Sequence, residues 1–204
     1  YTTMAGSLSA LLRGMRIPLL LLILIQVPAS EDNQGREVEV IPATKWFYRK
    51  AERGNKLIHK LLDAAKPTIG VTYQWGGTRL NKGIDCSNYT WQLYRKIGIP
   101  YDCFQSTLTL ANQRSGNALE SVPFEDARPG DLLVYGYRDD KKRWHGHVVI
   151  LVDKYGHTTG HKGLVLGAHG DDVMAVQFVT FEGYEENYFK NPRISLRNVL
   201  RPNT

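Results

Sequence analysis

One cysteine stands where a reactive thiol is expected. The stretch YQWGGTRLNKGIDCSN, residues 73–88, carries two adjacent glycines, a short polar loop and an acid, and then Cys86 opens a segment with helical spacing. The first turn of a helix offers unpaired backbone N–H groups and a partial positive charge, which favour a thiolate over a thiol. We therefore predict that Cys86 is a nucleophile activated by its place at a helix start.

Two histidines are the candidates for the base and its orienting group, which a thiolate nucleophile requires. His147 opens one apolar strand candidate and His169 closes the next. If these strands form an antiparallel hairpin centred near Thr158, the beginning of one meets the end of the other. We predict His147 as the base and His169 as the orienting group. His145 is the rival base, because a period of two residues puts it on the same strand face.

Other uses of the histidines and cysteines are weaker hypotheses. His157 and His161 are expected to be solvated turn residues, and no acid or cysteine completes a metal site with them. A disulfide between Cys86 and Cys103 is open from the sequence. It would silence the thiol, so we interpret Cys103 as a small buried side chain. We expect no metal and no cofactor.

Helical patterns precede strand patterns along the chain. Apolar residues recur at helical spacing over residues 46–65 and 86–97, and a short helix is expected over 106–114. The strand candidates that follow are residues 129–137, 145–153, 162–170, 173–184 and 193–202. This order predicts an α+β fold in which N-terminal helices, one of them carrying the nucleophile at its N-terminus, pack on an antiparallel β-sheet.

The first thirty residues differ from the rest. They contain an apolar run over residues 17–25 and a V-P-A segment suited to cleavage after Ala29. The run is shorter than the roughly 20 residues that a membrane-spanning helix needs. We predict a signal peptide at residues 1–30, a linker at 31–45 and one domain over 46–204. The protein is then secreted, periplasmic or otherwise in the cell envelope, without a stable membrane span after cleavage.

Composition and charge narrow the class of partner. With 42% hydrophobic and 23% charged residues, the chain has the composition of a globular protein. The formal net charge is +6, and two of the basic residues, Arg13 and Arg16, lie in the predicted signal. The excess that remains is small and is typical of a solubilising surface. We expect a monomer without a nucleic-acid partner.

Four blocks of sequence give the chain a family resemblance. They are Y-Q-W-G-G from Tyr73, G-I-D-C-S from Gly83, P-G-D-L-L from Pro129 and H-V-V-I from His147. In this order they make residues 50–202 resemble the NlpC-type cell-wall cysteine peptidases, a papain-like group. The resemblance implies a papain-like fold and hydrolysis of an amide in peptidoglycan stem peptides, typically between γ-linked D-glutamate and a diamino acid.

The resemblance also implies roles for single residues. It gives a catalytic set of Cys86 as nucleophile, His147 as base, His169 as the aligning polar residue and Tyr73 beside the cysteine. Asp85 and Ser87 match positions that commonly contact the free amine end of the peptide. Trp75, Trp91 and Trp144 are expected to pack in the core or at the rim, and Trp75, next to the glycines, is also the candidate for lining the substrate groove.

The sequence departs from the family pattern at a few places. Asn88 and Val149 stand where glycine is common, and the gap between His147 and His169 is longer than expected, which makes His161 the fallback third residue. The alternatives to a peptidase are a CHAP-like amidase, acyl transfer on the same thiolate, and a non-catalytic cell-wall-binding module on the same fold. The CHAP type lacks the tyrosine-tryptophan-glycine block, and an intact cysteine and histidine pair argues against a decayed site.

Overall fold

The computed structural model describes residues 56–99, 104–116, 118–154, 163–170, 173–180 and 193–203, together with the short strands β1 (Ser30–Glu31) and β2 (Glu37–Val38). The predicted signal peptide up to residue 29, most of the linker and the first part of the helix predicted over 46–65 lie outside these residues. Cys103, His157 and His161 lie outside them as well.

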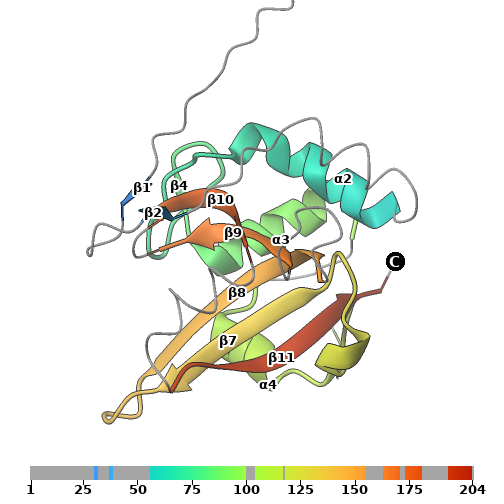
Figure 1. Cartoon of the computed structure of the whole chain (residues 1–204). Helices are drawn as coiled ribbons and strands as arrows, with labels where there is room; N and C mark the ends of the chain where they lie inside the picture. Colours follow the sequence, from blue (N-terminus) through green and yellow to red (C-terminus); the bar gives the residue numbers. More distant parts are fainter. Residues whose placement is uncertain are drawn as a thin grey trace, which may run out of the picture.

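Three helices occupy the N-terminal half of the described chain (Figure 1). Helix α2 (Lys56–Ala65) buries one apolar face and passes into a 3₁₀ turn, η1 (Lys66–Thr68), at the predicted stop. Helix α3 (Cys86–Lys96) begins at the cysteine, as predicted, and buries Tyr89 and Leu93 on one face. Helix α4 (Thr107–Asn112) is capped by the Ser106 hydroxyl. The three helix positions predicted from apolar spacing are thus confirmed where the structure describes them.

A seven-stranded sheet follows, in the order β10-β9-β8-β7-β11-β6-β5, and every pairing in it is antiparallel. All five predicted strands are present: β7 (Leu132–Arg138), β8 (Trp144–Asp153), β9 (Leu164–His169), β10 (Ala175–Thr180) and β11 (Ser195–Pro202). The pattern did not predict the short elements, which are β3 (Thr78–Arg79), β4 (Gly83–Ile84), β5 (Ser115–Gly116), β6 (Leu119–Ser121) and the 3₁₀ turn η2 (Phe124–Asp126).

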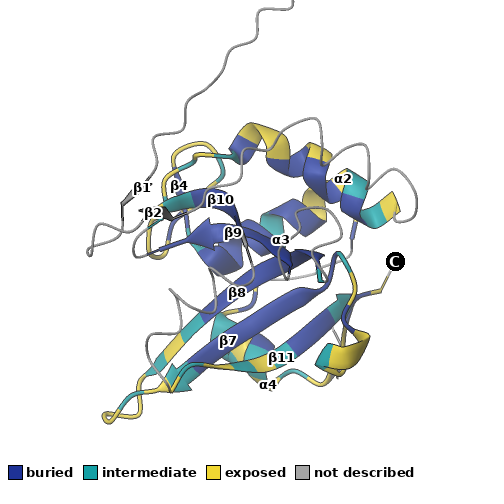
Figure 2. Ribbon diagram, in the orientation of Figure 1, coloured by how far each residue is buried: buried dark blue, intermediate teal, exposed yellow. Residues whose placement is uncertain are grey.

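The sheet buries both of its faces, which explains why its central strands read as continuous apolar runs rather than as alternating ones. Val148 and Ile150 of β8 join the core that contains α2 and α3, while Val149 and Leu151 join a second core on the opposite face. The central strands are buried along most of their length, and exposure begins at the β7–β8 hairpin tip (Figure 2).

The Pro-Gly-Asp block at the start of β7 anchors the sheet to the helices. Gly130 has φ +97°, and its carbonyl accepts a hydrogen bond of 2.5 Å from the hydroxyl of Tyr94 on α3. Asp131 is buried and accepts two hydrogen bonds from Arg201 on β11, at 3.0 and 3.2 Å, and one from the backbone N–H of Arg128 at 2.8 Å. This block of the family resemblance therefore has a structural role.

Candidate active site

The glycine loop before α3 fixes where the cysteine emerges. Gly76 has φ +69°, a region that favours glycine. A Cβ on Gly77 would lie 2.7 Å from the carbonyl oxygen of Gly83 and 2.8 Å from that of Gln74. The Gly77 carbonyl in turn accepts a hydrogen bond from the backbone N–H of Asp85. The two adjacent glycines thus form a tight turn that leads directly into the start of α3.

Asp85 caps α3 immediately before the cysteine. Its Oδ1 accepts hydrogen bonds from the Asn88 backbone N–H at 2.7 Å and from the Ser87 hydroxyl at 3.0 Å, and its Oδ2 accepts one from the Asn88 side-chain amide at 3.1 Å. Asn88, which departs from the family pattern, thus completes this cap. Asp85 and Ser87 are tied to each other in this structure, and the sequence interpretation missed the capping role of Asp85.

Cys86 is a free cysteine, 5% exposed, and its sulfur lies against the sheet. The sulfur is hydrogen-bonded by backbone groups of Val148, Ser87 and Cys86 itself. Val148 directly follows His147 in β8, so the thiol meets the sheet beside the predicted base. Sequence reasoning missed the Val148 contact, because it depends on how α3 docks on β8.

The ionisation predicted for the cysteine is wrong for the resting site. Burial, and after it the charge of the neighbouring Asp85, raise the pKa of the Cys86 thiol to about 12, against the backbone hydrogen bonds that lower it. The rise in pKa caused by removing the sulfur from water is larger than the fall in pKa expected from the helix terminus. Burial also lowers the pKa of His147 well below its usual value. The thiol and the imidazole are therefore both neutral in the resting site.

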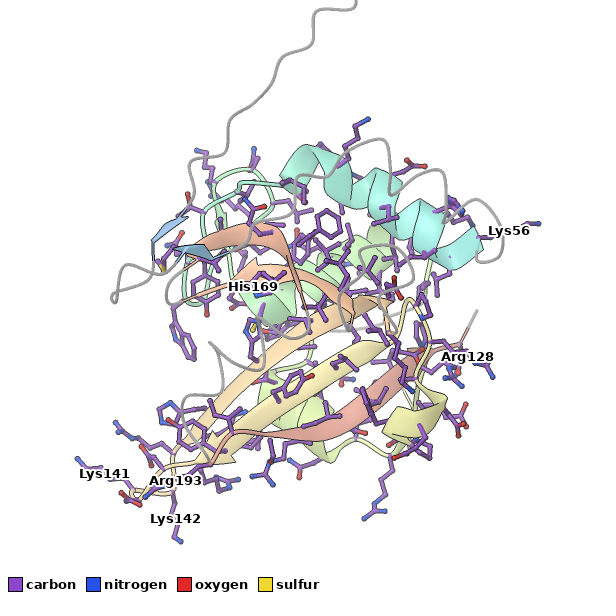
Figure 3. The ribbon with its side chains drawn as sticks, in the orientation of Figure 1. Lys56, Arg128, Lys141, Lys142, His169 and Arg193 are labelled. Carbon is purple, nitrogen blue, oxygen red and sulfur yellow. The ribbon has the colours of Figure 1, made fainter. Side chains whose placement is uncertain are left out.

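His147 and His169 come together as predicted from the hairpin. The β8–β9 register pairs Ile150 with Leu166, and continued along both strands it sets residue 147 opposite residue 169. The two imidazole rings lie 5.5 Å apart between centroids, tilted by 36°. They are 3% and 1% exposed, and His169 lies in the interior of the molecule (Figure 3). Burial and the nearby charge of His169 both lower the pKa of His147.

His169 is fixed in orientation by the next strand. Its Nε2 donates a hydrogen bond to the carbonyl oxygen of Gln177 on β10 at 3.1 Å. Burial lowers the pKa of His169 to about 4, and this hydrogen bond raises it in part. A ring held in one tautomer and packed against His147 limits the orientations open to His147.

The second departure from the family pattern is compensated across the hairpin. Val149 on β8 lies opposite Gly167 on β9, and a Cβ on Gly167 would come within 2.9 Å of the Val149 methyl and 3.2 Å of the His169 ring. A glycine on the partner strand thus makes room for the valine and for the histidine ring together.

A cavity of about 300 Å³ opens beside this pair. Its wall includes His147, Tyr73 and Trp75, the last being 79% exposed. A Cβ on Gly170 would lie 3.1 Å from the Tyr73 ring, so Tyr73 packs against the backbone that follows His169. Both aromatic residues therefore lie at the cavity, as expected. The sequence missed Tyr135, which also lines it and pairs with His147 across β7 and β8.

The rival base His145 lies farther along β8, towards the hairpin. Its ring stacks on Tyr137 at 4.9 Å, and its Nε2 lies 3.2 Å from Asp139 Oδ2. His145 lines the outer part of the cavity, whereas His147 is buried next to the strand position that contacts the sulfur. The geometry favours His147 as the base.

Within the described ranges, no group of three or more His, Cys, Asp or Glu side chains is placed to hold a metal ion. No helix in the described part of the chain combines the length and apolar character that a membrane crossing requires.

Comparison with known proteins gives one family. A sequence model of the NlpC/P60 family matches residues 70–193. The γ-D-glutamyl-L-lysine dipeptidyl-peptidase of Bacillus subtilis is 31% identical over 86 residues, which are 41% of this chain and 25% of that protein. The chain thus matches about a quarter of the length of this curated relative.

Two solved structures are similar to this chain. A lipoprotein-like NLP/P60 family protein from Staphylococcus aureus superposes with a TM-score of 0.52 at 19% identity, over 73% of this chain and 42% of that one. NlpC2 from Trichomonas vaginalis gives a TM-score of 0.46 at 17% identity, over 76% of this chain and 49% of that one. The first of these likenesses confirms the predicted α+β papain-like fold.

Proposed function

This chain belongs to the NlpC/P60 family, and we propose that it is a cysteine peptidase that hydrolyses amide bonds in peptidoglycan stem peptides. One observation carries the proposal: Cys86 begins α3 with its sulfur hydrogen-bonded by the backbone of Val148, the residue that follows His147, and His147, packed against His169, lines an open cavity. The B. subtilis relative is named for an activity on a γ-D-glutamyl-L-lysine bond, which supports this substrate class.

The first step begins from the neutral pair. As the Cys86 sulfur attacks the amide carbon, its proton passes to His147, and the carbonyl oxygen gains the negative charge. Such a transfer is favoured in a buried site, because no isolated charge has to form before the substrate arrives. His169 holds His147 in the orientation for this transfer.

The oxyanion is held by preorganised donors. The backbone N–H of Cys86, at the start of α3, is the first, and the hydroxyl of Tyr73 is a side-chain candidate. The tetrahedral intermediate collapses as the C–N bond breaks, and His147 gives its proton to the leaving amine. A water molecule, deprotonated by His147, then attacks the thioester carbon, which releases the carboxylic acid and restores the thiol.

The substrate side follows from the cavity. Trp75 presents an exposed ring at its wall, which suits the apolar part of a peptide. Asp85 and Ser87 lie beside the cysteine, and a protonated amine at the peptide end would replace their mutual hydrogen bond with an ion pair to Asp85. We assign Trp75, Asp85 and Ser87 to substrate binding. The bond to be cleaved, between γ-D-glutamate and the diamino acid, would lie in the cavity.

The proposed cell-wall substrate fits the organisation predicted from the sequence. A signal peptide at residues 1–30, a linker at 31–45 and a peptidase domain over 46–204 would place a monomeric enzyme in the cell envelope or outside the cell. Western blotting of cell and culture fractions, with residues 1–30 present or deleted, tests this part. Retention of the intact chain inside the cell would contradict it.

The activity is tested by digestion of purified muropeptides, with products identified by mass. The parent protein is expected to release fragments cut between D-glutamate and the diamino acid, and Cys86→Ala is expected to release none. Fragments cut at the link between sugar and peptide would indicate an amidase, and binding by both proteins without products would indicate a wall-binding module. Equal cutting by the parent and Cys86→Ala would contradict the proposed nucleophile.

A further inference from the structure

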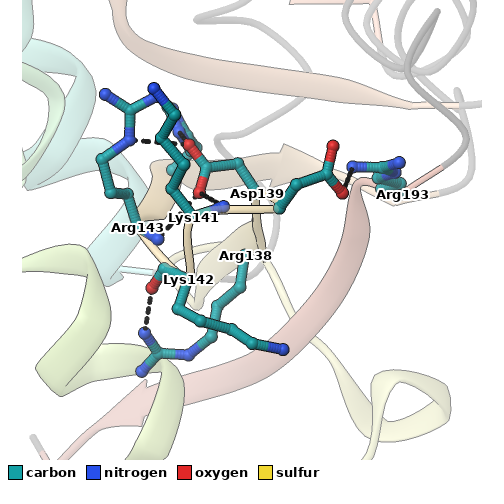
Figure 4. A network of polar contacts seen from close by, with 8 residues as sticks. Arg138, Asp139, Lys141, Lys142, Arg143 and Arg193 are labelled. Atoms are coloured by element: carbon teal, nitrogen blue, oxygen red, sulfur yellow. Dashed lines mark hydrogen bonds and ion pairs between the residues drawn. The ribbon is translucent and has the colours of Figure 1, made fainter.

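The β7–β8 hairpin carries a dense set of charges at its tip. Residues 138–143 read RDDKKR, four basic and two acidic side chains in succession. Asp139 is bound within the hairpin: its carboxylate pairs with Arg143 at 2.7 Å and with His145 at 3.2 Å. Asp140 pairs with Arg193 at 2.8 Å (Figure 4). Both acids are thus engaged by neighbouring basic groups, and the tip keeps an excess of positive charge.

Two lysines at the tip are left for an outside partner. Lys141 and Lys142 are exposed, and neither forms an ion pair with the described residues. The turn that presents them is well defined, since Lys142 has φ +63° and its carbonyl accepts a hydrogen bond of 2.9 Å from Arg138. They project from one end of the molecule, far from Lys56 at the other end (Figure 3).

A basic groove of about 520 Å³ lies beside the tip. It runs between α4 and the ends of β7 and β11, and Arg138, Arg193 and Arg197 line it. Arg197 donates to the Gly136 carbonyl at 2.8 Å, and Arg138 donates to a carbonyl of the turn. A guanidinium has five N–H donors. Hydrogen bonds to the described residues use only a minority of the donors of Arg138 and Arg197, and the others can bind a ligand.

We propose that this tip and groove bind a flexible polymer of phosphodiesters, an interaction beyond the proposed hydrolysis. Guanidinium forks fit the two free oxygens of a phosphodiester, and lysines add point charges along the chain. A membrane surface fits poorly, because residues 138–143 contain no apolar side chain to insert.

Single-stranded nucleic acid also fits the groove poorly, because it relies on aromatic rings that stack on bases. The indole N–H of Trp144 donates to Thr107 at 3.0 Å, and its ring lies over Gly136 and Gly146, where no Cβ would fit. This ring is therefore committed to packing within the fold. Trp144 and Tyr137 line the groove, but the Trp144 ring packs on the two glycines and the Tyr137 ring stacks on His145, so both rings already have a packing partner. A polymer without bases needs no such ring.

The test titrates the full chain with soluble poly(glycerol phosphate) over a range of salt concentrations. Lys141→Gln/Lys142→Gln is expected to bind about tenfold more weakly, and the slope of log Kd against log salt is expected to fall by about 1.4. Lys56→Gln/Lys60→Gln removes the same charge from the exposed face of α2 and is expected to bind within about twofold of the parent. Equal loss in both double variants would overturn the proposal.

Other probes decide the identity of the ligand. Tighter or equal binding of polyglutamate, of a single-stranded oligonucleotide or of anionic phospholipid vesicles would overturn the phosphodiester assignment. Equal competition by inorganic phosphate at the same phosphorus concentration would overturn the polymer assignment. Cys86→Ala is expected to bind poly(glycerol phosphate) as tightly as the parent does, so the binding proposal is tested independently of the peptidase activity.

Discussion

The ionisation state of Cys86 gives the sharpest quantitative prediction. A pKa of about 12 leaves about one thiol in 10⁵ ionised at pH 7. Because the thiolate is the reactive form, alkylation of Cys86 is expected to accelerate about tenfold for each pH unit between pH 7 and 10. A pair already ionised at neutral pH would instead react at a nearly constant rate over this range.

Iodoacetamide labelling measures this slope. Peptide mapping by mass follows Cys86 apart from Cys103, and the unfolded protein supplies the reference, since its thiols titrate near pH 8.5 and should be labelled fast at pH 9. His147→Gln is the matched variant: it should change the slope little if the resting pair is neutral, and should slow labelling strongly at neutral pH if His147 had stabilised a thiolate. A fast, pH-independent rate between pH 6 and 9 would refute the neutral pair.

Three further predictions concern the elements that hold the site. Gly77→Ala is expected to lower the free energy of unfolding by about 1–3 kcal/mol and to reduce kcat/KM about 10²-fold, because the new Cβ meets two backbone carbonyls. At Gly76 a Cβ would have open space but φ is +69°, so Gly76→Ala should lower the free energy of unfolding, measured by urea denaturation, by only about 1 kcal/mol. Equal effects of the two substitutions would contradict the crowding at Gly77. The folded-state pKa of His169, about 4, lies below its unfolded value, so its contribution to stability is present above pH 6.5 and is lost as the pH falls towards 4, by up to about 3 kcal/mol. Melting curves of His169→Gln should show a shallower loss over that window, and an unchanged slope would be evidence against the buried neutral ring. Arg201→Leu should destabilise the fold by about 2 kcal/mol, since it leaves the buried Asp131 carboxylate with one backbone donor, and a loss below about 0.5 kcal/mol would count against this anchor.

The pairing of the two histidines was predictable because it depends on local arithmetic. Strand residues alternate and antiparallel partners add to a constant, so one assumed turn centre near Thr158 set His147 opposite His169. The start of α3 at Cys86 was predictable for a similar reason, since spacing and the glycine loop mark it. Such features need only neighbours in sequence and one correct pairing.

The state of the thiol was not predictable in the same way. The pKa of Cys86 is set by how completely α3 and β8 exclude water, which is a property of tertiary packing summed over distant segments. The sequence interpretation weighed the helix terminus and a neighbouring imidazole but not the burial of the sulfur, and so it predicted the wrong direction for the pKa shift. For the same reason the sequence did not reveal that Gly167 makes room for Val149, because that contact depends on the strand register.

The charged hairpin also illustrates this limit. From the sequence, RDDKKR is only a charged loop between two strand candidates. The structure shows that both acids are paired and that Arg193 and Arg197, about fifty residues later, join the same end of the sheet. A surface property of this kind depends on residues that are distant in the sequence, so it can be recognised only once the fold is known.

The most direct test of the central claim is to trap the acyl-enzyme. Parent protein is mixed with a muropeptide, quenched in acid within milliseconds to seconds, and weighed intact. We predict a mass increase equal to that of the acyl fragment that ends in D-glutamate, located on Cys86 by fragmentation and absent from Cys86→Ala. Continued cleavage with no adduct on Cys86, or an adduct on a different residue, would contradict it.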